Sequence, residues 1–274
     1  MAEQATPATQ VAGENRESKA VELSVIAPTY NESDNLEALV AEVGSALRGV
    51  EYEILICDDD SPDRTWARAE EIGRRDPRVR VLRRTKDRGL ARAVVDGFTH
   101  ARGKAVACID ADLQHDPAIL PQMLQALRGG AQLVVASRYV AGGGTANWNW
   151  RRRFTSWVAA RMADFSLGVP LHDPMSGYFL LWRADFLPVR GKLNPDGFKI
   201  LLEIAAQLQP ARVCEVPYTF RLRHAGKSKL SSRVIFAYIF QLFRLYCAGH
   251  TFQRPESEAA PKGVAEAGRH RSAA

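Results

Sequence analysis

Two aspartates, Asp110 and Asp112, stand one residue apart at the end of a short hydrophobic run, residues 105–109. The run has the length and composition of a buried strand, which would place both carboxylates at the strand end. Ionised carboxylates this close repel one another, so the pair needs a cation or several hydrogen-bond donors. Mg²⁺ or Mn²⁺ would meet that need and leave coordination positions for a substrate diphosphate. The alternative is that Asp112 or Asp116 only caps a helix that begins near Pro117.

The elements that must position these carboxylates repeat one unit between residues 21 and 137. A short aliphatic run is followed each time by an amphipathic helical pattern. The predicted strands are 23–27, 54–57, 79–82, 105–109 and 133–136, and the predicted helices lie at about 34–47, 64–75, 89–101 and 117–128. This alternation predicts an α/β fold with a mostly parallel sheet and helices on both faces.

Polar residues gather directly after the predicted strands. They occupy residues 28–32, 58–63, 110–112 and 137–139. Because ligands of such sheets bind beyond the carboxyl ends of the strands, we expect one site along that edge. Four polar residues in or next to these ranges are interpreted as turn formers or helix caps: Ser33, Ser61, Asp63 and Asp116. Asp59, Asp110 and Asp112 are the candidates for chemistry.

Composition and motifs exclude several classes of protein. A chain of 274 residues with 46% hydrophobic content can bury a substantial core. The net charge of +6 suits nucleotides, phospholipid headgroups or nucleic acid, without choosing among them. The four cysteines form no Cys-x-x-Cys pair and are interpreted as reduced core residues of a cytosolic protein. No Gly-x-Gly-x-x-Gly follows the first strand and no P-loop motif occurs, which removes the main support for dinucleotide or P-loop binding.

Short motifs along the whole chain resemble one known family. They are 28–32, 58–63, 110–115, 137–139, 173–180, 197–203, 215–220 and 223–230. In this order they resemble the inverting family 2 glycosyltransferases of GT-A fold, specifically the polyprenyl-phosphate (dolichol-phosphate) mannosyltransferases. The resemblance covers about residues 21–245. It implies a Rossmann-like GT-A sheet followed by interfacial helices.

The resemblance also implies roles for individual residues. The pocket for the base and ribose of a nucleotide-sugar donor would be lined by Pro28, Tyr30, Glu32, Cys57 and Asp59. The metal, Mg²⁺ or Mn²⁺, would be bound by Asp110, Asp112 and Gln114, and Ala111 would touch the nucleotide through its backbone. Arg223 and Lys229 would close over the diphosphate and, with Asp112, act in catalysis. The lipid-borne acceptor phosphate would be held by Arg138, Arg152 and Ser156.

One residue departs from the family pattern. Asp60 stands where the family usually has Gly or Ala, and a further carboxylate beside a diphosphate would repel it. We therefore expect Asp60 to point to solvent or to pair with a basic side chain such as Arg64.

The second half of the chain predicts contact with a membrane surface. Basic and aromatic residues adjoin at 148–157 and lead into an amphipathic segment, which alternatively packs against the sheet. Residues 234–246 are apolar but fall short of the ~20 residues that span a bilayer, and are interpreted as an interfacial helix. The predicted organisation is a flexible arm at 1–20, a catalytic domain at 21–230, an amphipathic helix at 231–252 and a disordered tail at 253–274. The predicted location is peripheral, on the cytoplasmic side of a membrane, alone or beside a membrane-anchored partner.

The predicted reaction needs little acid–base chemistry. A lipid monophosphate is already anionic and can attack the anomeric carbon, while the metal, Arg223 and Lys229 stabilise the leaving diphosphate. An α-linked donor, GDP-mannose in the favoured interpretation, would give a β-linked polyprenyl-phosphate sugar. Glu203 is a further candidate for contacts with sugar hydroxyls. The alternatives are glucose transfer from UDP-glucose and a sugar-nucleotide-binding protein without turnover. A nucleic-acid partner is not expected, because the basic residues are scattered.

Overall fold

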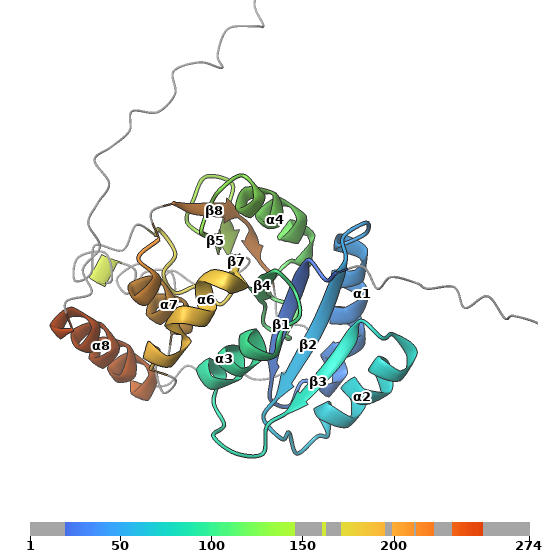
Figure 1. The fold of residues 1–274 in the computed structure, drawn as a ribbon. Helices are drawn as coiled ribbons and strands as arrows, with labels where there is room; N and C mark the ends of the chain where they lie inside the picture. The colour runs from blue at the N-terminus through green and yellow to red at the C-terminus, as the bar shows by residue number, and fades with distance from the viewer. Residues whose placement is uncertain are drawn as a thin grey trace, which may run out of the picture.

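The computed structural model describes residues 20–145, 161–162, 171–194, 199–210, 212–221 and 232–248. Within the last of these segments, side chains are described only from Phe240 onward. Its main element is a seven-stranded sheet of order β3-β2-β1-β4-β7-β5-β8 (Figure 1). The strands are β1 (Leu23–Thr29), β2 (Tyr52–Asp58), β3 (Val79–Arg83), β4 (Ala105–Cys108), β5 (Leu133–Ser137), β7 (Phe179–Trp182) and β8 (Val213–Pro217). Neighbouring strands are parallel except β7, which runs antiparallel to both β4 and β5. A second, parallel pair joins β6 (Gly144–Thr145) to β9 (Thr219–Phe220).

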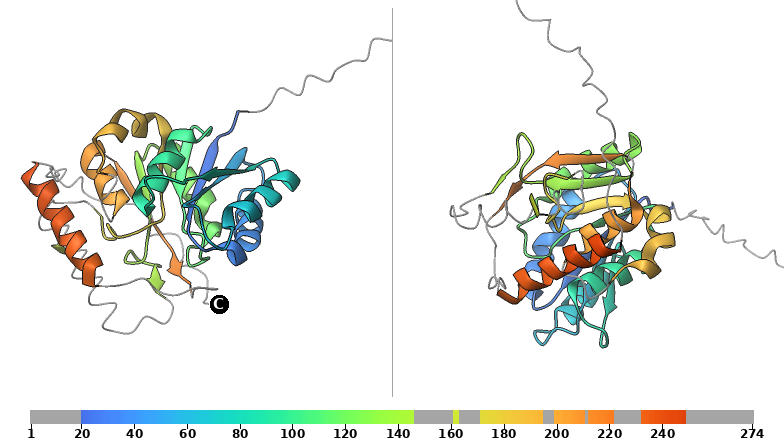
Figure 2. Two further views of the ribbon diagram at one scale, coloured as in Figure 1. Left: turned by 90° about the horizontal axis from the view of Figure 1, so that it is seen from below. Right: turned by 90° about the vertical axis from the view of Figure 1, so that its left-hand side faces the viewer.

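Helices cover both faces of the sheet, as the sequence predicts (Figure 2). The first face carries α1 (Leu36–Ala46), α2 (Thr65–Arg75) and α4 (Leu120–Arg128). The second face carries α3 (Leu90–His100), α6 (Arg183–Val189), α7 (Ile200–Leu208) and, outermost, α8 (Ser232–Cys247). Three short 3₁₀ segments, Ser33–Asn35, Pro117–Ile119 and Arg190–Lys192, complete the described elements.

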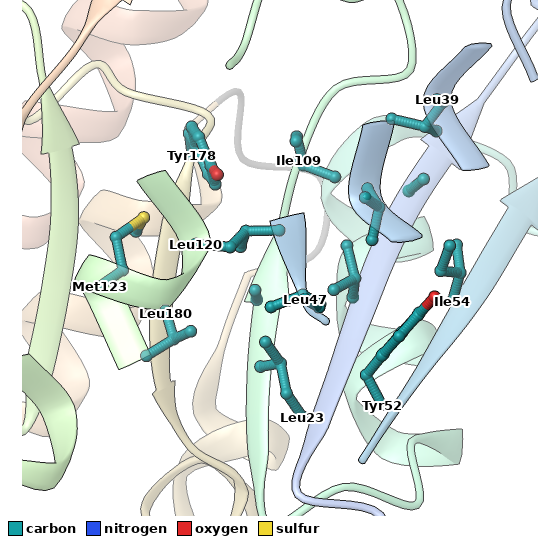
Figure 3. Close-up of a cluster of buried hydrophobic side chains, with 14 of the residues drawn as sticks. Leu23, Leu39, Leu47, Tyr52, Ile54, Ile109, Leu120, Met123, Tyr178 and Leu180 are labelled. Carbon is teal, nitrogen blue, oxygen red and sulfur yellow. The ribbon is translucent and has the colours of Figure 1, made fainter. Parts of the chain in front are cut away.

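The side-chain alternation of β1 explains why the sheet is covered on both sides. All seven residues of β1 are buried. Val25 and Ala27 pack with the helices of the first face, and Ile26 packs with those of the second. Such continuous apolar runs are typical of strands buried between two helical layers. Figure 3 shows part of the first core, where Leu39 of α1 and Leu120 and Met123 of α4 point toward the sheet.

The predicted elements are confirmed with small changes of boundary. The five predicted strands appear as β1 to β5, and the predicted strand at 105–109 ends one residue earlier, at Cys108. The strand β7 is not among the sequence predictions, and it separates β4 from β5. The interpretation of the cysteines as core residues holds for Cys57 and Cys108 only, because Cys214 is half-buried and Cys247 is exposed; all four are free thiols.

The helix predicted near the C-terminus is present as α8. Within the described ranges, no helix combines the length and apolar character that crossing a bilayer requires. The predicted arm before residue 20, the tail at 253–274 and the basic aromatic stretch at 148–157 lie outside the described residues.

Candidate active site

The carboxyl ends of β1, β2 and β4 meet at one edge of the sheet. In the register of β1 with β2, Pro28 lies opposite Cys57 and Thr29 lies opposite Asp58. Tyr30 follows β1 with 42% of its surface exposed. Glu32 accepts a hydrogen bond from the side-chain amide of Asn35 at 2.6 Å. The structure therefore brings the predicted donor-binding residues of β1 and β2 to neighbouring positions.

The buried carboxylate of Asp58 ties the ends of β1 and β2 together. It accepts hydrogen bonds from the Thr29 hydroxyl at 2.9 Å and from the Ser61 hydroxyl and backbone N–H. The Ser61 hydroxyl in turn accepts from the backbone N–H of Asn31 at 3.0 Å. Asp58 and Ser61 thus shape the loops that would carry the donor, and the sequence pattern does not reveal this structural role of Asp58.

The predicted capping role is confirmed for Asp116, whereas Asp63 is a turn former, since α2 has no side-chain cap. Asp116 accepts from the backbone N–H of Ala118 at 2.9 Å and caps the segment Pro117–Ile119. Asp63 accepts from the backbone and hydroxyl of Thr65 and from the backbone N–H of Ser33. The first 3₁₀ segment, Ser33–Asn35, has no side-chain cap, so the expectation that Ser33 is a cap is wrong.

Asp59 holds the start of α3. Its side chain pairs with the guanidinium of Arg84, and its other oxygen accepts the backbone N–H of Gly89 at 2.7 Å. Arg84 is itself only 6% exposed and also binds Asp96 at 2.7 Å. Each carboxylate oxygen can accept more than one hydrogen bond. The bonds to Arg84 and Gly89 are therefore compatible with a further contact between Asp59 and a nucleotide-sugar donor.

Asp60 pairs with Arg83 and Arg88, not with the expected Arg64. The Arg83 guanidinium lies 2.6 Å from Oδ1 of Asp60, and Arg88 binds the second oxygen. The backbone φ of Asp60 is 54°, in the left-handed region where glycine is most at ease and Asp is among the better tolerated side chains. Two cations therefore offset the extra negative charge that the sequence places here.

Cys57 can contact a ligand at this edge only through its backbone. Its side chain is completely buried in the second core, and burial raises the pKa of the thiol. A Cβ added at Gly97 of α3 would lie 2.8 Å from this sulfur, which shows how closely the helix packs on it. The predicted contact of Cys57 with a donor would have to be made by main-chain atoms.

The three predicted metal ligands lie in one turn after β4. The Asp110 side chain is 38% exposed, whereas Asp112 and Gln114 are only 6% and 9% exposed. Asp112 accepts the backbone N–H of Gln114 at 3.1 Å, and Leu113 between them has a positive φ of 61°. The Gln114 amide donates to the carbonyl of Arg221 at 3.2 Å, so its oxygen is the atom suited to a cation.

This donor set fits a hard divalent cation. Two carboxylates and one amide supply oxygen atoms only, as Mg²⁺ and Mn²⁺ prefer. Among the residues that the structure describes, no three His, Cys, Asp or Glu side chains form a metal cluster. Because Mg²⁺ prefers octahedral geometry, the three proposed protein ligands would leave coordination positions for substrate oxygens.

His115 supports this turn from the interior. Its ring stacks on Tyr178, with centroids 5.2 Å apart, and meets Tyr218 and Phe220 edge-on. Burial lowers the pKa of His115 to about 4, so the ring is neutral at physiological pH. The neutral Nδ1 accepts the backbone N–H of Asp110 at 3.1 Å. The sequence motif contains this histidine, but its spacing alone gives no indication of a supporting role.

Gly177 lies against the Asp110 carboxylate. A Cβ added at this position would lie 3.3 Å from Oδ2 of Asp110 and 3.4 Å from the His115 ring. Both distances are tighter than most real Cβ contacts, so the carboxylate or the ring must give way. The absence of a side chain at residue 177 thus leaves room for Asp110 in its present orientation.

We expect Gly177→Ala to weaken Mn²⁺ binding about three- to tenfold, because a displacement of one ligand by a few tenths of an ångström is costly at a metal site. Isothermal titration of the purified protein with Mn²⁺ measures this. Gly191→Ala is the control, since nothing lies within 4 Å of a Cβ at that position. Equal affinities for both variants would contradict the close approach described here.

Arg138 and Asp173 form a buried ion pair beside the metal turn. The guanidinium binds the carboxylate through two bonds of 2.7 Å, and the backbone N–H of Arg138 adds a third of 3.1 Å. The side chains are 8% and 0% exposed. Burial alone would lower the pKa of Arg138, but the hydrogen bonds and charge of Asp173 raise it above its usual value. Arg138 is thus fixed by a partner, Asp173, that the sequence alone does not identify.

Other predicted site residues cannot be placed in the same way. Arg152, Ser156, Arg223 and Lys229 lie outside the described residues. Glu203 is described, and its carboxylate is fully buried against Gln241 and Arg244 of α8. The interpretation of Glu203 as a contact for sugar hydroxyls is therefore wrong in this structure.

The fold and this acidic edge define a class of enzyme that comparison with known proteins establishes. The model of the family "Glycosyl transferase family 2" matches residues 24–187, more than half of the chain. The chain belongs to glycosyl transferase family 2.

Curated relatives narrow the resemblance further. The chain is 44% identical to a dolichol-phosphate mannosyltransferase of Pyrococcus furiosus over 227 residues, covering 82% of this chain and 64% of that protein. It thus spans less than two thirds of that relative. It is 36% identical to the dolichol-phosphate mannosyltransferase of Saccharomyces cerevisiae, covering 82% of this chain and 87% of the yeast protein. A polyprenol monophosphomannose synthase of Mycolicibacterium smegmatis is 40% identical, with coverage of 80% and 84%.

Solved structures share the fold at lower sequence identity. A mannosyltransferase from Pyrobaculum calidifontis, solved with GDP-Man and Mn²⁺, matches with a TM-score of 0.58 and 17% identity, covering 85% of this chain and 64% of that one. A mannosyl-3-phosphoglycerate synthase from Rubrobacter xylanophilus matches with a TM-score of 0.62 and 20% identity, covering 89% and 82%. The predicted GT-A architecture is confirmed.

Proposed function

We propose that this protein transfers a mannosyl group from GDP-mannose to a polyprenyl monophosphate, with inversion at the anomeric carbon. The observation that carries the proposal is the turn of Asp110, Asp112 and Gln114 at the carboxyl edge of a family 2 sheet, beside the buried Arg138. The relatives named above, at 36% to 44% identity, supply the substrate class.

The donor would lie across the ends of β1, β2 and β4. Tyr30, Glu32 and Asp59 would face its base and ribose, and Pro28, Cys57 and Ala111 would contribute backbone and apolar contacts. Asp110, Asp112 and Gln114 would hold Mg²⁺ or Mn²⁺, which, when bound, offsets the charge of the leaving diphosphate. The proposed catalytic roles of Arg223 and Lys229 add positive charge on the other side of that diphosphate.

The acceptor needs no general base. A phosphate monoester has its second pKa near about 6, so the lipid phosphate is ionised at neutral pH. One of its oxygens forms the bond to the anomeric carbon as the bond to the nucleoside diphosphate breaks. Attack opposite an α-linked leaving group gives a β-linked product. Arg138, Arg152 and Ser156 are proposed to orient the acceptor phosphate for this attack.

Transfer assays test the proposal directly. Radiolabelled GDP-mannose and UDP-glucose are offered in parallel with a short polyprenyl phosphate in detergent, with Mn²⁺ or EDTA. EDTA-sensitive transfer from GDP-mannose is the expected result. Transfer from UDP-glucose alone would keep the reaction and replace the donor, and nucleotide binding without any transfer would favour a sugar-nucleotide-binding protein.

We also propose that the enzyme works peripherally, on the cytoplasmic surface of a membrane, with α8 at the interface. Phe240, Phe243 and Tyr246 of α8 are 66%, 64% and 57% exposed. Their spacing of three residues sets them along one side of the helix. Exposed aromatic rings on a helix are suited to the boundary between headgroups and acyl chains.

The variant Phe243→Ser is expected to lower the fraction of protein that sediments with anionic liposomes, by about threefold or more, because a buried ring contributes roughly 1.5–3 kcal/mol. Leu90→Ser is the matched control, since Leu90 is 53% exposed at the start of α3 rather than on α8. The membrane proposal fails if both variants sediment like the unaltered protein.

A further inference from the structure

One loop, residues 173–177, touches three separate parts of the site. At its beginning Asp173 binds Arg138, and at its end Gly177 lies against Asp110. Between them, the backbone carbonyl of Met175 accepts a hydrogen bond of 3.2 Å from the ammonium group of Lys199. The loop therefore binds a lysine at its middle, while its two ends contact a proposed metal ligand and the proposed acceptor-binding arginine.

The surroundings of Lys199 contain both signs of charge. Burial lowers the pKa of Lys199 to about 8, with the positive charge of Arg138 acting in the same direction and Asp110 and Asp173 acting against it. The two oxygens of Asp173 already bind Arg138, and Asp110 belongs to the proposed metal set. Lys199 thus brings a second positive charge to the place where two phosphate-bearing substrates would meet.

The backbone of Lys199 is held by α8. Gln241 accepts the Lys199 N–H at 3.1 Å and donates to the Lys199 carbonyl at 3.0 Å. The same amide donates to Glu203 at 3.0 Å, and Arg244 binds that carboxylate as well. Gln241 is 2% exposed and Glu203 is fully buried, so this network is part of the interior.

Lys199 is thereby connected to the helix that carries the exposed aromatic rings. Figure 2 shows α8 on the outside of the molecule, on the side where α7 lies. Lys199 directly precedes α7, and Gln241 belongs to α8. A side chain of the outer helix therefore fixes a residue that reaches the catalytic edge.

We propose that Lys199 is a further phosphate-binding residue of this site, that its ammonium group contacts the phosphate of the acceptor, and that Gln241 positions it. This inference rests on the proposed function, since it assigns a further contact to the same acceptor. An ammonium group has three donors, so the bond to Met175 is compatible with a bond to a phosphate oxygen. A phosphate at this place would lie between two cations, Lys199 and Arg138.

The first test is steady-state kinetics of Lys199→Met, Lys199→Arg and Gln241→Leu. We expect Lys199→Met to raise the KM for polyprenyl phosphate about tenfold or more while the KM for the nucleotide sugar changes less than about twofold, because a charge-assisted hydrogen bond is lost only to the acceptor. Lys199→Arg should restore most of the acceptor affinity. Gln241→Leu should also raise the KM for polyprenyl phosphate, by a smaller factor than Lys199→Met. Lys104→Met, an exposed lysine at the opposite end of β4, is the matched control.

A second measurement does not depend on turnover. Binding of a fluorescent short-chain polyprenyl phosphate in detergent, without donor, is titrated for the unaltered protein and Lys199→Met, with thermal unfolding recorded for both. Weaker binding by the variant supports the inference even if the unaltered protein transfers no mannose, in which case only the proposed function falls.

Three results would overturn the inference. The first is normal transfer and normal acceptor affinity in Lys199→Met, which leaves the proposed function standing. The second is a rise of both KM values by the same factor together with a lower unfolding temperature, which would assign a structural role. The third, absence of any polyprenyl phosphate binding by the unaltered protein, would remove the inference and the proposed function together.

Discussion

Asp110→Asn is expected to reduce metal-dependent sugar transfer at least about a hundredfold, a loss of about 3 kcal/mol of transition-state stabilisation. The substitution keeps the size of the side chain and removes the charge that would hold a divalent cation. The fold should not suffer, because the Asp110 side chain is 38% exposed and its supporting bond to His115 comes from the backbone. Transfer rates with Mn²⁺ and the thermal unfolding midpoint measure the two effects separately.

The control for this substitution is Asp87→Asn. The Asp87 side chain is 79% exposed, and its carboxylate lies 3.8 Å from the Arg92 guanidinium. The same chemical change there should leave transfer within about twofold of the unaltered rate, as is usual for surface substitutions. Unimpaired Mn²⁺-dependent transfer by the Asp110 variant would show that the metal site has been placed wrongly.

Arg138→Met is expected to lower the free energy of unfolding by about 3–5 kcal/mol, because it leaves the fully buried carboxylate of Asp173 without its partner. The methionine fills much of the space of the arginine stem, so the missing charge and hydrogen bonds dominate the loss. Urea unfolding followed by circular dichroism measures it. The variant would also bind the acceptor weakly. The loss of stability is the main effect expected from breaking the ion pair of Arg138 and Asp173.

Arg128→Met provides the comparison for a surface pair. Arg128 is 52% exposed and binds Glu22 at 2.6 Å. Exposed pairs contribute about 0–1 kcal/mol, so this variant should be nearly as stable as the unaltered protein. If both variants lost the same small amount, the pair of Arg138 and Asp173 would not have the structural role assigned to it.

The sequence predicts most of this fold because hydrophobic periodicity is a local property. Each of the strands β1 to β5 carries an apolar run that can be recognised without knowing its neighbours. The short strand β7 cannot be recognised that way, because its partners are distant in sequence: Phe179 lies opposite Cys108 of β4 and opposite Val135 of β5. Only the assembled sheet, not the four-residue run itself, determines that β7 runs antiparallel between them.

The candidate site, like the fold, can be predicted from the sequence only in part. Their positions after predicted strands, together with the family resemblance, indicate Asp59, Asp110 and Asp112 as site residues. The structure places all three at the same edge of the sheet. The partners of Asp60 could not be predicted, because Arg83 ends a different strand, β3, and Arg88 follows that strand, so both approach Asp60 through the pairing of β2 with β3. The supporting contacts of His115 and Lys199 depend likewise on aromatic and backbone groups that are distant in sequence.

The position of β7 has a consequence for how the chain acquires its structure during synthesis. Strands β4 and β5 each have an edge that only β7 fills, and β7 is made after both of them. Until residues 179–182 leave the ribosome, those two edges carry unpaired backbone groups that can pair with other chains. The ribosome-bound nascent chain should therefore be most prone to aggregation before β7 emerges, and closure of the sheet should be a late, non-local step.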